Sequence, residues 1–130
     1  MQTFARWVYH EDTYVIEIYQ ALLSVLWGGW LLAPWPTFPS TPTFRVMALL
    51  MPEELWGGML ICVGLLHGCG LARRSLSVRR ASILLGFAIW VAISTAIVSA
   101  NWRTTATITY PWVAINYALV YWRVGYRNHV

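Results

Sequence analysis

The pattern of apolar and polar positions divides this chain into four long apolar stretches separated by short polar segments. The stretches cover residues 15–33, 54–72, 81–102 and 106–124, and 81–102 runs for 22 residues without a charged side chain. About 20 apolar residues in a helix cross the roughly 30 Å hydrocarbon core of a bilayer. We therefore predict an all-α, polytopic membrane protein in which residues 1–130 form a single four-helix transmembrane bundle.

Small residues recur in these stretches at the spacing that lets two helix backbones approach closely. Alanine occupies every fourth position in the third stretch, and the second contains a GxxxG pair. LWGG occurs near the end of the first stretch and near the start of the second, which places both copies at the same membrane depth if these helices are antiparallel. In lipid, close packing of small residues holds helices together. We therefore expect a set of glycines and alanines to mediate helix packing and association between copies of the chain. They are Gly28, Gly29, Gly57, Gly58, Gly64, Gly68, Ala88, Ala92, Ala96 and Ala100.

The segment between the first two stretches, residues 34–52, holds five of the six prolines. Pro36, Pro39 and Pro42 repeat every three residues, which suits an extended polyproline-II path and predicts a stiff outer loop across the helix ends. Residues 44–51 are apolar but too short to span a bilayer, so we expect a short interfacial helix there.

The first 14 residues mix aromatic and charged side chains. They are compatible either with an amphipathic helix in the headgroup layer or with a loosely ordered tail. Asp12 or Thr13 is in a position to cap the first membrane helix.

Composition and charge agree with a membrane location. Charged residues make up 11% of the chain, whereas soluble domains have about 25%. Four spans place both termini and residues 73–80 on one side, together with seven of the nine arginines. The positive-inside rule then predicts a multi-pass inner-membrane protein with both termini in the cytoplasm. We expect the loop arginines Arg73, Arg74, Arg79 and Arg80 to contact the lipid bilayer, and we expect no nucleic-acid partner.

Tryptophans gather near the ends of the predicted helices, where amphipathic rings favour the headgroup layer. We assign six of them to the two membrane interfaces. They are Trp27, Trp30, Trp56, Trp102, Trp112 and Trp122.

Five polar residues fall within the predicted spans: Glu17, His67, Ser94, Thr95 and Asn116. An ionisable group in a membrane is a functional candidate, but Glu17 is close enough to the helix end to pair with a C-terminal arginine. Asn116 suits a hydrogen bond across helices or, together with Ser94 and Thr95, a polar path.

Motifs for catalysis and metal binding are missing from the sequence. It contains no HExxH, GxSxG or P-loop pattern, and no GxGxxG after a predicted strand. His67 lies near Cys62 and Cys69, but three donors on one helix fall short of the four that a structural zinc site needs. We expect a protein that is not an enzyme, with no catalytic residues, no metal and no cofactor.

One extended pattern resembles a known group of proteins. LWGGWLLAPWPTFPSTPTFRVM, then MPEELWGG, a basic turn and two further spans, is similar to small four-span membrane proteins of unassigned function in tailed bacteriophages and prophages. The resemblance covers most of residues 20–124 and implies a phage or bacterial source and an inner-membrane location. It rests on Trp27, Gly28, Pro34, Thr37, Phe38, Pro52, Glu53, Trp56 and Gly57.

Three hypotheses for function follow from these patterns. The first is a phage-type protein that self-associates into a homo-oligomer and permeabilises the membrane as a holin does. The second is a membrane anchor or accessory subunit that binds another membrane protein without forming a pore, for example in superinfection exclusion. The third is a small channel or transporter.

Overall fold

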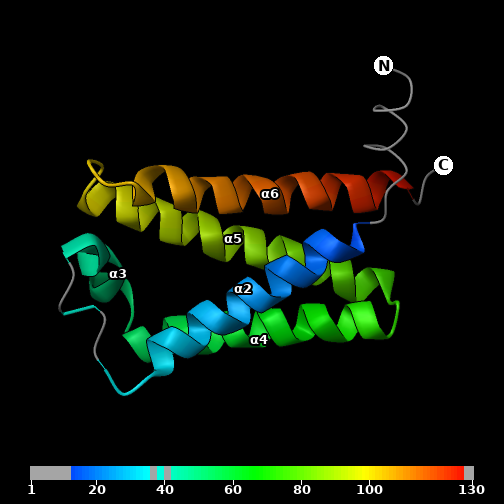
Figure 1. Ribbon diagram of the computed structural model, residues 1–130, viewed down its shortest axis with the longest axis horizontal. Helices are drawn as coiled ribbons and strands as arrows, with labels where there is room; N and C mark the ends of the chain where they lie inside the picture. Colours follow the sequence, from blue (N-terminus) through cyan, green and yellow to red (C-terminus); the bar gives the residue numbers. More distant parts are fainter. Residues whose placement is uncertain (1–12, 36–37, 40–41, 128–130) are drawn as a thin grey trace.

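The computed structural model describes residues 13–35, 38–39 and 42–127, and it describes residues 126 and 127 by their backbone alone. Four long helices run side by side, and two short helical segments cap one end of the bundle (Figure 1). The elements are α2 (Tyr14–Leu32), η1 (Pro42–Phe44), α3 (Arg45–Leu50), α4 (Glu53–Ala72), α5 (Leu76–Ala100) and α6 (Ala106–Arg127). All secondary structure in the described ranges is helical, as the sequence predicted.

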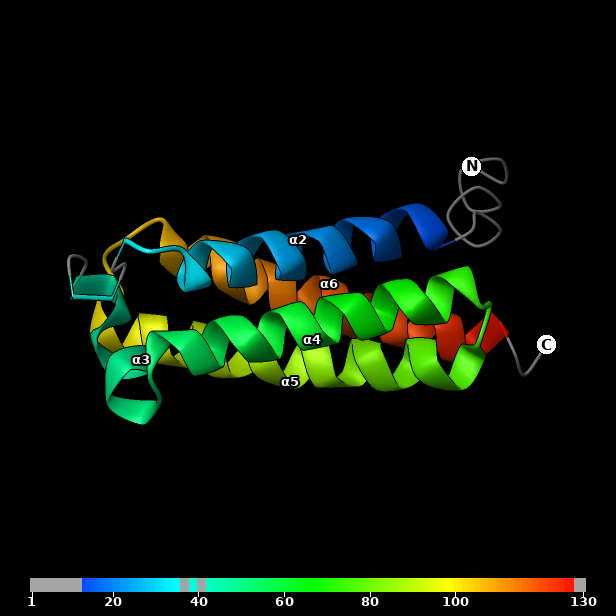
Figure 2. The same ribbon diagram turned by 90° about the horizontal axis from the view of Figure 1, so that it is seen from below.

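The helices pack as two pairs joined through their middle members. α2 lies along α4, α6 lies along α5, and α4 and α5 contact each other. Figure 2 shows the α4 and α5 ribbons next to each other along their length, with α2 on the other side of α4. The segments η1 and α3 pack near the end of the bundle where α5 finishes.

Three of the described helices, α2, α4 and α5, are long and apolar enough to cross a membrane. α6 has 22 residues but is less apolar, because its sequence mixes aromatic side chains with threonines and Asn116. The polytopic helical architecture therefore agrees with the prediction, with three helices rather than four having the apolarity of a membrane span.

The burial pattern of α2 is the reverse of that in a water-soluble bundle. Its polar residues Glu17, Gln20 and Ser24 are buried. Its large apolar residues, such as Leu22 and Leu26, are exposed. In water such a helix would expose its apolar side to solvent, whereas lipid accepts that side and the bundle shelters the polar one. The pattern indicates that the bundle sits in a membrane.

The junction between α4 and α5 is a tight turn that moves the start of α5 to Leu76, five residues before the predicted start. The N–H of Arg74 donates to the Leu71 carbonyl at 3.2 Å, and the N–H of Ser75 donates to the Gly70 carbonyl at 3.0 Å. These are the two hydrogen bonds of a Schellman motif. Arg74 takes the left-handed position, with φ of 52°.

Ser75 then caps α5, because its Oγ accepts a hydrogen bond from the N–H of Val78. Arg79 and Arg80 consequently lie inside the helix rather than in a loop, and the position of Arg79 on α5 decides where its side chain points. The other three long helices begin and end within three residues of the predicted bounds.

The proline-rich segment follows a different path from the predicted one. Pro39 lies in a turn and Pro42 begins the 3-10 helix η1, so the polyproline-II prediction is wrong where the structure describes this segment. Pro36 lies outside the described residues. The N–H of Phe38 donates to Oε2 of Glu53 at 3.3 Å, and the Phe38 ring stacks on Phe44. These contacts hold the segment against the start of α4.

The short helix expected at residues 44–51 is present as α3. The N-terminal segment lies outside the described residues up to position 12. Thr13 stands at the N-cap of α2, but its side chain makes no capping hydrogen bond.

Candidate functional site

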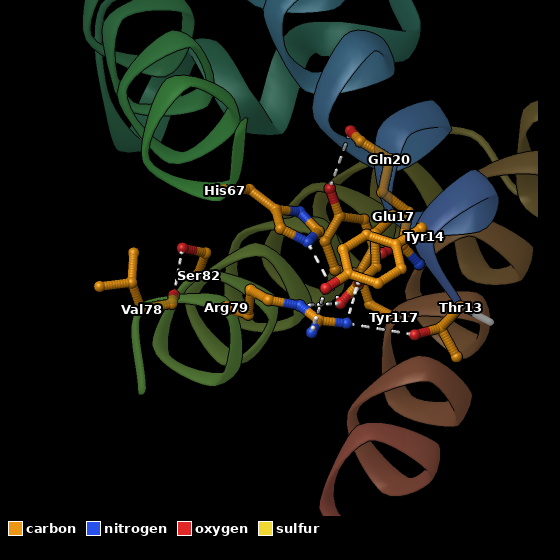
Figure 3. Close-up of polar contacts among 9 residues, drawn as sticks. All are labelled: Thr13, Tyr14, Glu17, Gln20, His67, Val78, Arg79, Ser82 and Tyr117. Atoms are coloured by element: carbon orange, nitrogen blue, oxygen red, sulfur yellow. Dashed lines mark hydrogen bonds and ion pairs between the residues drawn. The ribbon is translucent and has the colours of Figure 1, made fainter. Parts of the chain in front are cut away.

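The candidate site is a buried polar cluster near the start of α2, where α4 ends and α5 begins (Figure 3). We use the name buried polar cluster for Thr13, Tyr14, Glu17, Gln20, His67 and Arg79. Its centre is an ion pair between α2 and α5. Arg79 donates to Glu17 from Nη2 to Oε2 at 2.6 Å and from Nε to Oε1 at 3.3 Å. The Glu17 side chain is fully buried, and that of Arg79 is 12% exposed.

Arg79 also holds the start of α2. Its Nη2 donates to Oγ1 of Thr13 at 3.4 Å and its Nη1 donates to the Tyr14 hydroxyl at 3.5 Å. The guanidinium carbon lies 4.5 Å from the centre of the Tyr14 ring, which is a cation–π contact. Most donors of this arginine therefore have partners on one turn of α2, so a single side chain fixes how α2 and α5 sit together.

His67 approaches the ion pair from α4. Its Nε2 lies 3.7 Å from Oε1 of Glu17, and the imidazole is completely buried. Neither ring nitrogen has a hydrogen-bond partner in the described part of the chain. The Glu17 carboxylate thus lies between a permanent cation on α5 and an imidazole that carries charge only when protonated.

A second polar contact lies deeper in the bundle and joins α2, α5 and α6. Ser24 Oγ and the Tyr117 hydroxyl are 2.8 Å apart, and Nε1 of Trp90 donates to the same Oγ at 3.4 Å. The Tyr117 hydroxyl is also 3.2 Å from the carbonyl of Gln20, to which it donates. Tyr117 reaches α2 across Gly86, where a Cβ would come within 2.4 Å of its ring.

The Gln20 side chain lies between these two groups of contacts. It is 5% exposed, and both its amide oxygen and its amide nitrogen lack a hydrogen-bond partner among the described residues. Burying an unsatisfied polar group costs about 1–3 kcal/mol. The Gln20 amide and the His67 imidazole therefore give this part of the bundle buried polar atoms without hydrogen-bond partners among the described residues.

In each LWGG sequence, one glycine lies at a helix contact and the other does not. A Cβ on Gly28 would lie 2.6 Å from the Gly57 carbonyl, and one on Gly57 would lie 2.8 Å from the Gly28 carbonyl. These two residues are therefore where α2 and α4 touch. Gly29 and Gly58 have open space at the same positions.

In the GxxxG pair of α4, likewise, one glycine lies at a helix contact and the other does not. Gly64 meets Val25 and the backbone of Ala21, whereas Gly68 has nothing within 4 Å. Gly64 therefore contacts α2, whereas a Cβ on Gly68 would meet no other described residue.

The alanine stripe of α5 does not stay on one face. Ala96 is buried and Ala100 half-buried, but Ala88 and Ala92 are exposed. Each residue turns the helix by about 100°, so a four-residue step overshoots a full turn by about 40°. From Ala88 to Ala100 the stripe therefore rotates by about 120°. The buried and the exposed alanines therefore lie on different faces of α5.

The predicted polar path is not assembled. Asn116 donates from Nδ2 to the Trp112 carbonyl of its own helix at 2.8 Å, so the prediction of a bond across helices is wrong. Ser94 and Thr95 donate to the carbonyls of Trp90 and Val91, four residues earlier. Hydroxyls that bond within their own helix are satisfied without a neighbour.

The tryptophans separate into exposed and packed rings. Four of the six lie mostly exposed, as interface residues would: Trp30, Trp102, Trp112 and Trp122. Trp56 is 2% exposed and donates from Nε1 to the Met47 carbonyl at 3.1 Å, so it does not face the headgroup layer. Trp27 is half-buried and packs edge-on against the core residue Trp90 at 5.5 Å.

The four arginines between residues 73 and 80 are not equivalent. Arg73 and Arg74 are exposed, as lipid-contacting residues would be. Arg79 turns into the bundle, and Arg80 lies half-buried beside α6. The expectation that Glu17 pairs with a C-terminal arginine is corrected by the position of Arg79, because α5 starts early enough to bring that residue against α2.

The polar face of α2 carries a sequence signal that identifies the cluster. Thr13, Glu17, Gln20 and Ser24 are spaced by four, three and four residues, so they share one face of a helix. The partners Arg79, Trp90 and Tyr117 carry no such signal, because each depends on how another helix is rotated.

The cluster has the chemistry of a structural site, in which a buried ion pair joins α2 and α5. Within the described ranges, no three His, Cys, Asp or Glu side chains gather in a way that could hold a metal ion. Cys62 and Cys69 are exposed free thiols on α4. Comparison with known proteins adds no assignment: no protein-family model, curated protein or solved structure matches this chain.

Proposed function

We propose that this chain is a four-span protein of the bacterial inner membrane that associates with copies of itself. We propose further that the assembly permeabilises the membrane as a phage holin does. The observation that carries the proposal is an unpartnered seam on α5. By α5 seam we mean the exposed residues Ala81, Leu85, Ala88, Ala92, Thr95 and Ser99.

The α5 seam has the spacing of a helix–helix contact. Its residues alternate in steps of four and three, which is the repeat that keeps one face of a helix against a partner at a small crossing angle. Five of its six residues are small, so a second helix can approach closely. No other described helix of the chain covers these positions. A second copy of α5 fits this seam because the same residues then face each other.

A groove beside the seam extends the same surface. It has a volume of about 690 Å³ and lies between α5 and α6, with Thr95 and Ser99 on its wall. Most of its lining is apolar, and Pro111, Ala114 and Ala118 form the α6 side. A groove next to a small-residue seam allows larger side chains of a neighbouring copy to interlock. This supports self-association through the α5–α6 side of the bundle.

The proposal includes α6 as the fourth span. Its 22 residues give a length of about 33 Å, enough to cross the hydrocarbon core. Its exposed tryptophans, Trp112 and Trp122, lie near opposite ends. The arginine-rich end of the bundle, where α4 turns into α5, then faces the cytoplasm.

The interior of one subunit favours permeabilisation between subunits over a path through a single chain. The rings of Trp27, Trp90 and Tyr110 pack against one another inside the bundle, with ring centres 5.5 to 6.1 Å apart. Asn116, which a small channel or transporter would use, does not line the groove with Ser94 and Thr95. We therefore place the opening at the contacts between copies.

The same filled interior favours one alternative, a membrane anchor or accessory subunit that binds another membrane protein and opens nothing. Both functions use the exposed α5–α6 side. They differ in whether the protein alone dissipates an ion gradient.

The test is expression in bacterial cells while membrane potential is followed with a fluorescent dye. We expect the natural chain to depolarise the membrane and to arrest growth. Ala92→Leu should weaken this effect at equal membrane abundance, because the larger side chain lies in the α5 seam. Cys62→Leu is the matched control, since Cys62 is exposed on α4 away from the seam. A normal potential in cells that contain the natural chain would contradict permeabilisation and favour the anchor.

A further inference from the structure

A small pocket opens between α5 and α6 at the arginine-rich end of the bundle. Its volume is about 360 Å³. It is lined by Leu76, Ser77, Arg80, Ala81, Leu84 and Tyr121. The pocket is separate from the buried polar cluster, in which Arg79 points toward α2. We propose that it binds the phosphate of an anionic phospholipid headgroup, with Arg80 as the counter-ion.

Arg80 is a cation with spare donors. Its Nη2 donates to the Tyr121 hydroxyl at 3.4 Å, and its guanidinium carbon lies 5.2 Å from the centre of the Tyr121 ring. The described residues supply no acceptor for its Nε. A guanidinium presents five N–H donors in a planar fork that matches the oxygens of a phosphate.

The described residues at this end offer Arg80 no free carboxylate. Among the described residues, Glu17 is the acidic residue at this end, and Arg79 already binds it through two hydrogen bonds. Glu53 and Glu54 lie in the first turn of α4, at the opposite end of the bundle. An anion from the surroundings is therefore the natural partner for Arg80, and in a membrane the abundant anion is a lipid phosphate.

The distribution of polar and apolar residues also matches a lipid. Ser77 and Arg80 lie near the start of α5, where the headgroup layer would be, and the Ser77 hydroxyl offers a second donor. Ala81 and Leu84 continue the same face toward the middle of the membrane, and Leu84 is 51% exposed. A headgroup at the polar end would therefore place an acyl chain along the apolar end.

The inference rests on the proposed position of this end in the headgroup layer, but not on permeabilisation. It is tested on the purified full-length chain in a neutral detergent, where no membrane potential is involved. Thermal unfolding is followed by tryptophan fluorescence while dioleoylphosphatidylglycerol, dioleoylphosphatidylcholine or inorganic phosphate is added. We expect phosphatidylglycerol to raise the unfolding temperature by about 3 °C more than phosphatidylcholine does.

Two variants assign the shift to the pocket. Arg80→Gln should abolish the extra shift with phosphatidylglycerol, while Arg73→Gln should keep it, because Arg73 has the same charge but is exposed in the turn. Leu84→Trp fills the apolar end without removing charge and should also abolish it, which covers the case in which Arg80→Gln fails to fold. Equal shifts for the natural chain and either pocket variant would overturn the proposal. A shift that inorganic phosphate reproduces in full would overturn the lipid as the ligand.

Discussion

Glu17 and Arg79 carry opposite charges in a part of the bundle that is almost closed to solvent. The carboxylate is fully buried, and two hydrogen bonds of 2.6 and 3.3 Å join it to the guanidinium. Removing a charge from water costs several kcal/mol, and a partner with good geometry offsets most of this cost. Each residue therefore depends on the other, and either one alone would be an uncompensated charge.

Breaking this pair should destabilise the bundle. We expect Glu17→Gln and Arg79→Gln each to lower the free energy of unfolding by about 3 kcal/mol, since each leaves one charge buried and unpaired. The double variant with both substitutions should recover most of the loss, because no charge remains. The measurement is unfolding in mixed detergent micelles by titration with a denaturing detergent. Losses that simply add in the double variant would show that the two residues act independently.

The sequence identified Glu17 and His67 as unusual, but not their surroundings. Glu17 stands out because few carboxylates occur within apolar stretches. Its partner could not be deduced, because Arg79 and the C-terminal arginines lie at the same end of the chain's helices. The choice depends on the start of α5, which the Ser75 cap and the Arg74 turn bring forward to Leu76. Such a shift rotates every side chain near the helix end relative to its neighbours.

At the scale of elements, α2 and α4 pack so closely that their backbones touch. The contact is at Gly28 and Gly57, where the Cβ of any other residue would come within 3 Å of a carbonyl oxygen on the facing helix. In lipid, close contact of this kind replaces the hydrophobic effect as the source of helix association.

Neighbouring glycines provide a matched test of this contact. Gly28→Ala should lower the free energy of unfolding by about 2 kcal/mol, because the added methyl group forces the two helices apart. Gly29→Ala adds the same methyl group one position later, where there is open space. It should be neutral or slightly stabilising, since alanine is the better helix former. The same micelle unfolding assay measures both, and equal effects from the two variants would rule out the proposed helix contact.

The helices themselves were predictable, but the faces they use were not. Long apolar runs and the LWGG repeats locate α2 and α4 to within one residue of the observed bounds. The spacing of the α5 alanines indicated close packing but not which of them are buried, because a rotation of about 100° per residue separates Ala88 from Ala100. Apolar residues also cannot show which side of a membrane helix faces lipid, since both sides are apolar. Trp56 was misplaced for this reason, whereas Asn116 was misplaced because its amide bonds to the Trp112 carbonyl of its own helix.

At the scale of the whole molecule, the bundle is closely packed between α2 and α4 and has an exposed groove between α5 and α6. α2 and α4 meet along a closely packed line, whereas the outer side of α5 and α6 keeps a seam of small residues and a groove of about 690 Å³. Positive charge is concentrated at one end along the length of the bundle. The arginines at the end where α4 turns into α5 include Arg73, Arg74, Arg79, Arg80 and Arg123. A molecule of this shape suits side-by-side association in a membrane with a fixed orientation.

The measurement that tests self-association most directly is disulfide cross-linking along α5 in native membranes. Single cysteines replace Leu84, Ala88, Ala92 and Thr95 on α5 and Leu65 on α4, in a background in which Cys62 and Cys69 are alanine. All five positions are exposed in a single chain. We expect oxidation to give strong dimers at the seam positions Ala88, Ala92 and Thr95, and weak ones at Leu84 and Leu65. Equal cross-linking at all five positions, or none at the seam, would contradict association through the α5 seam.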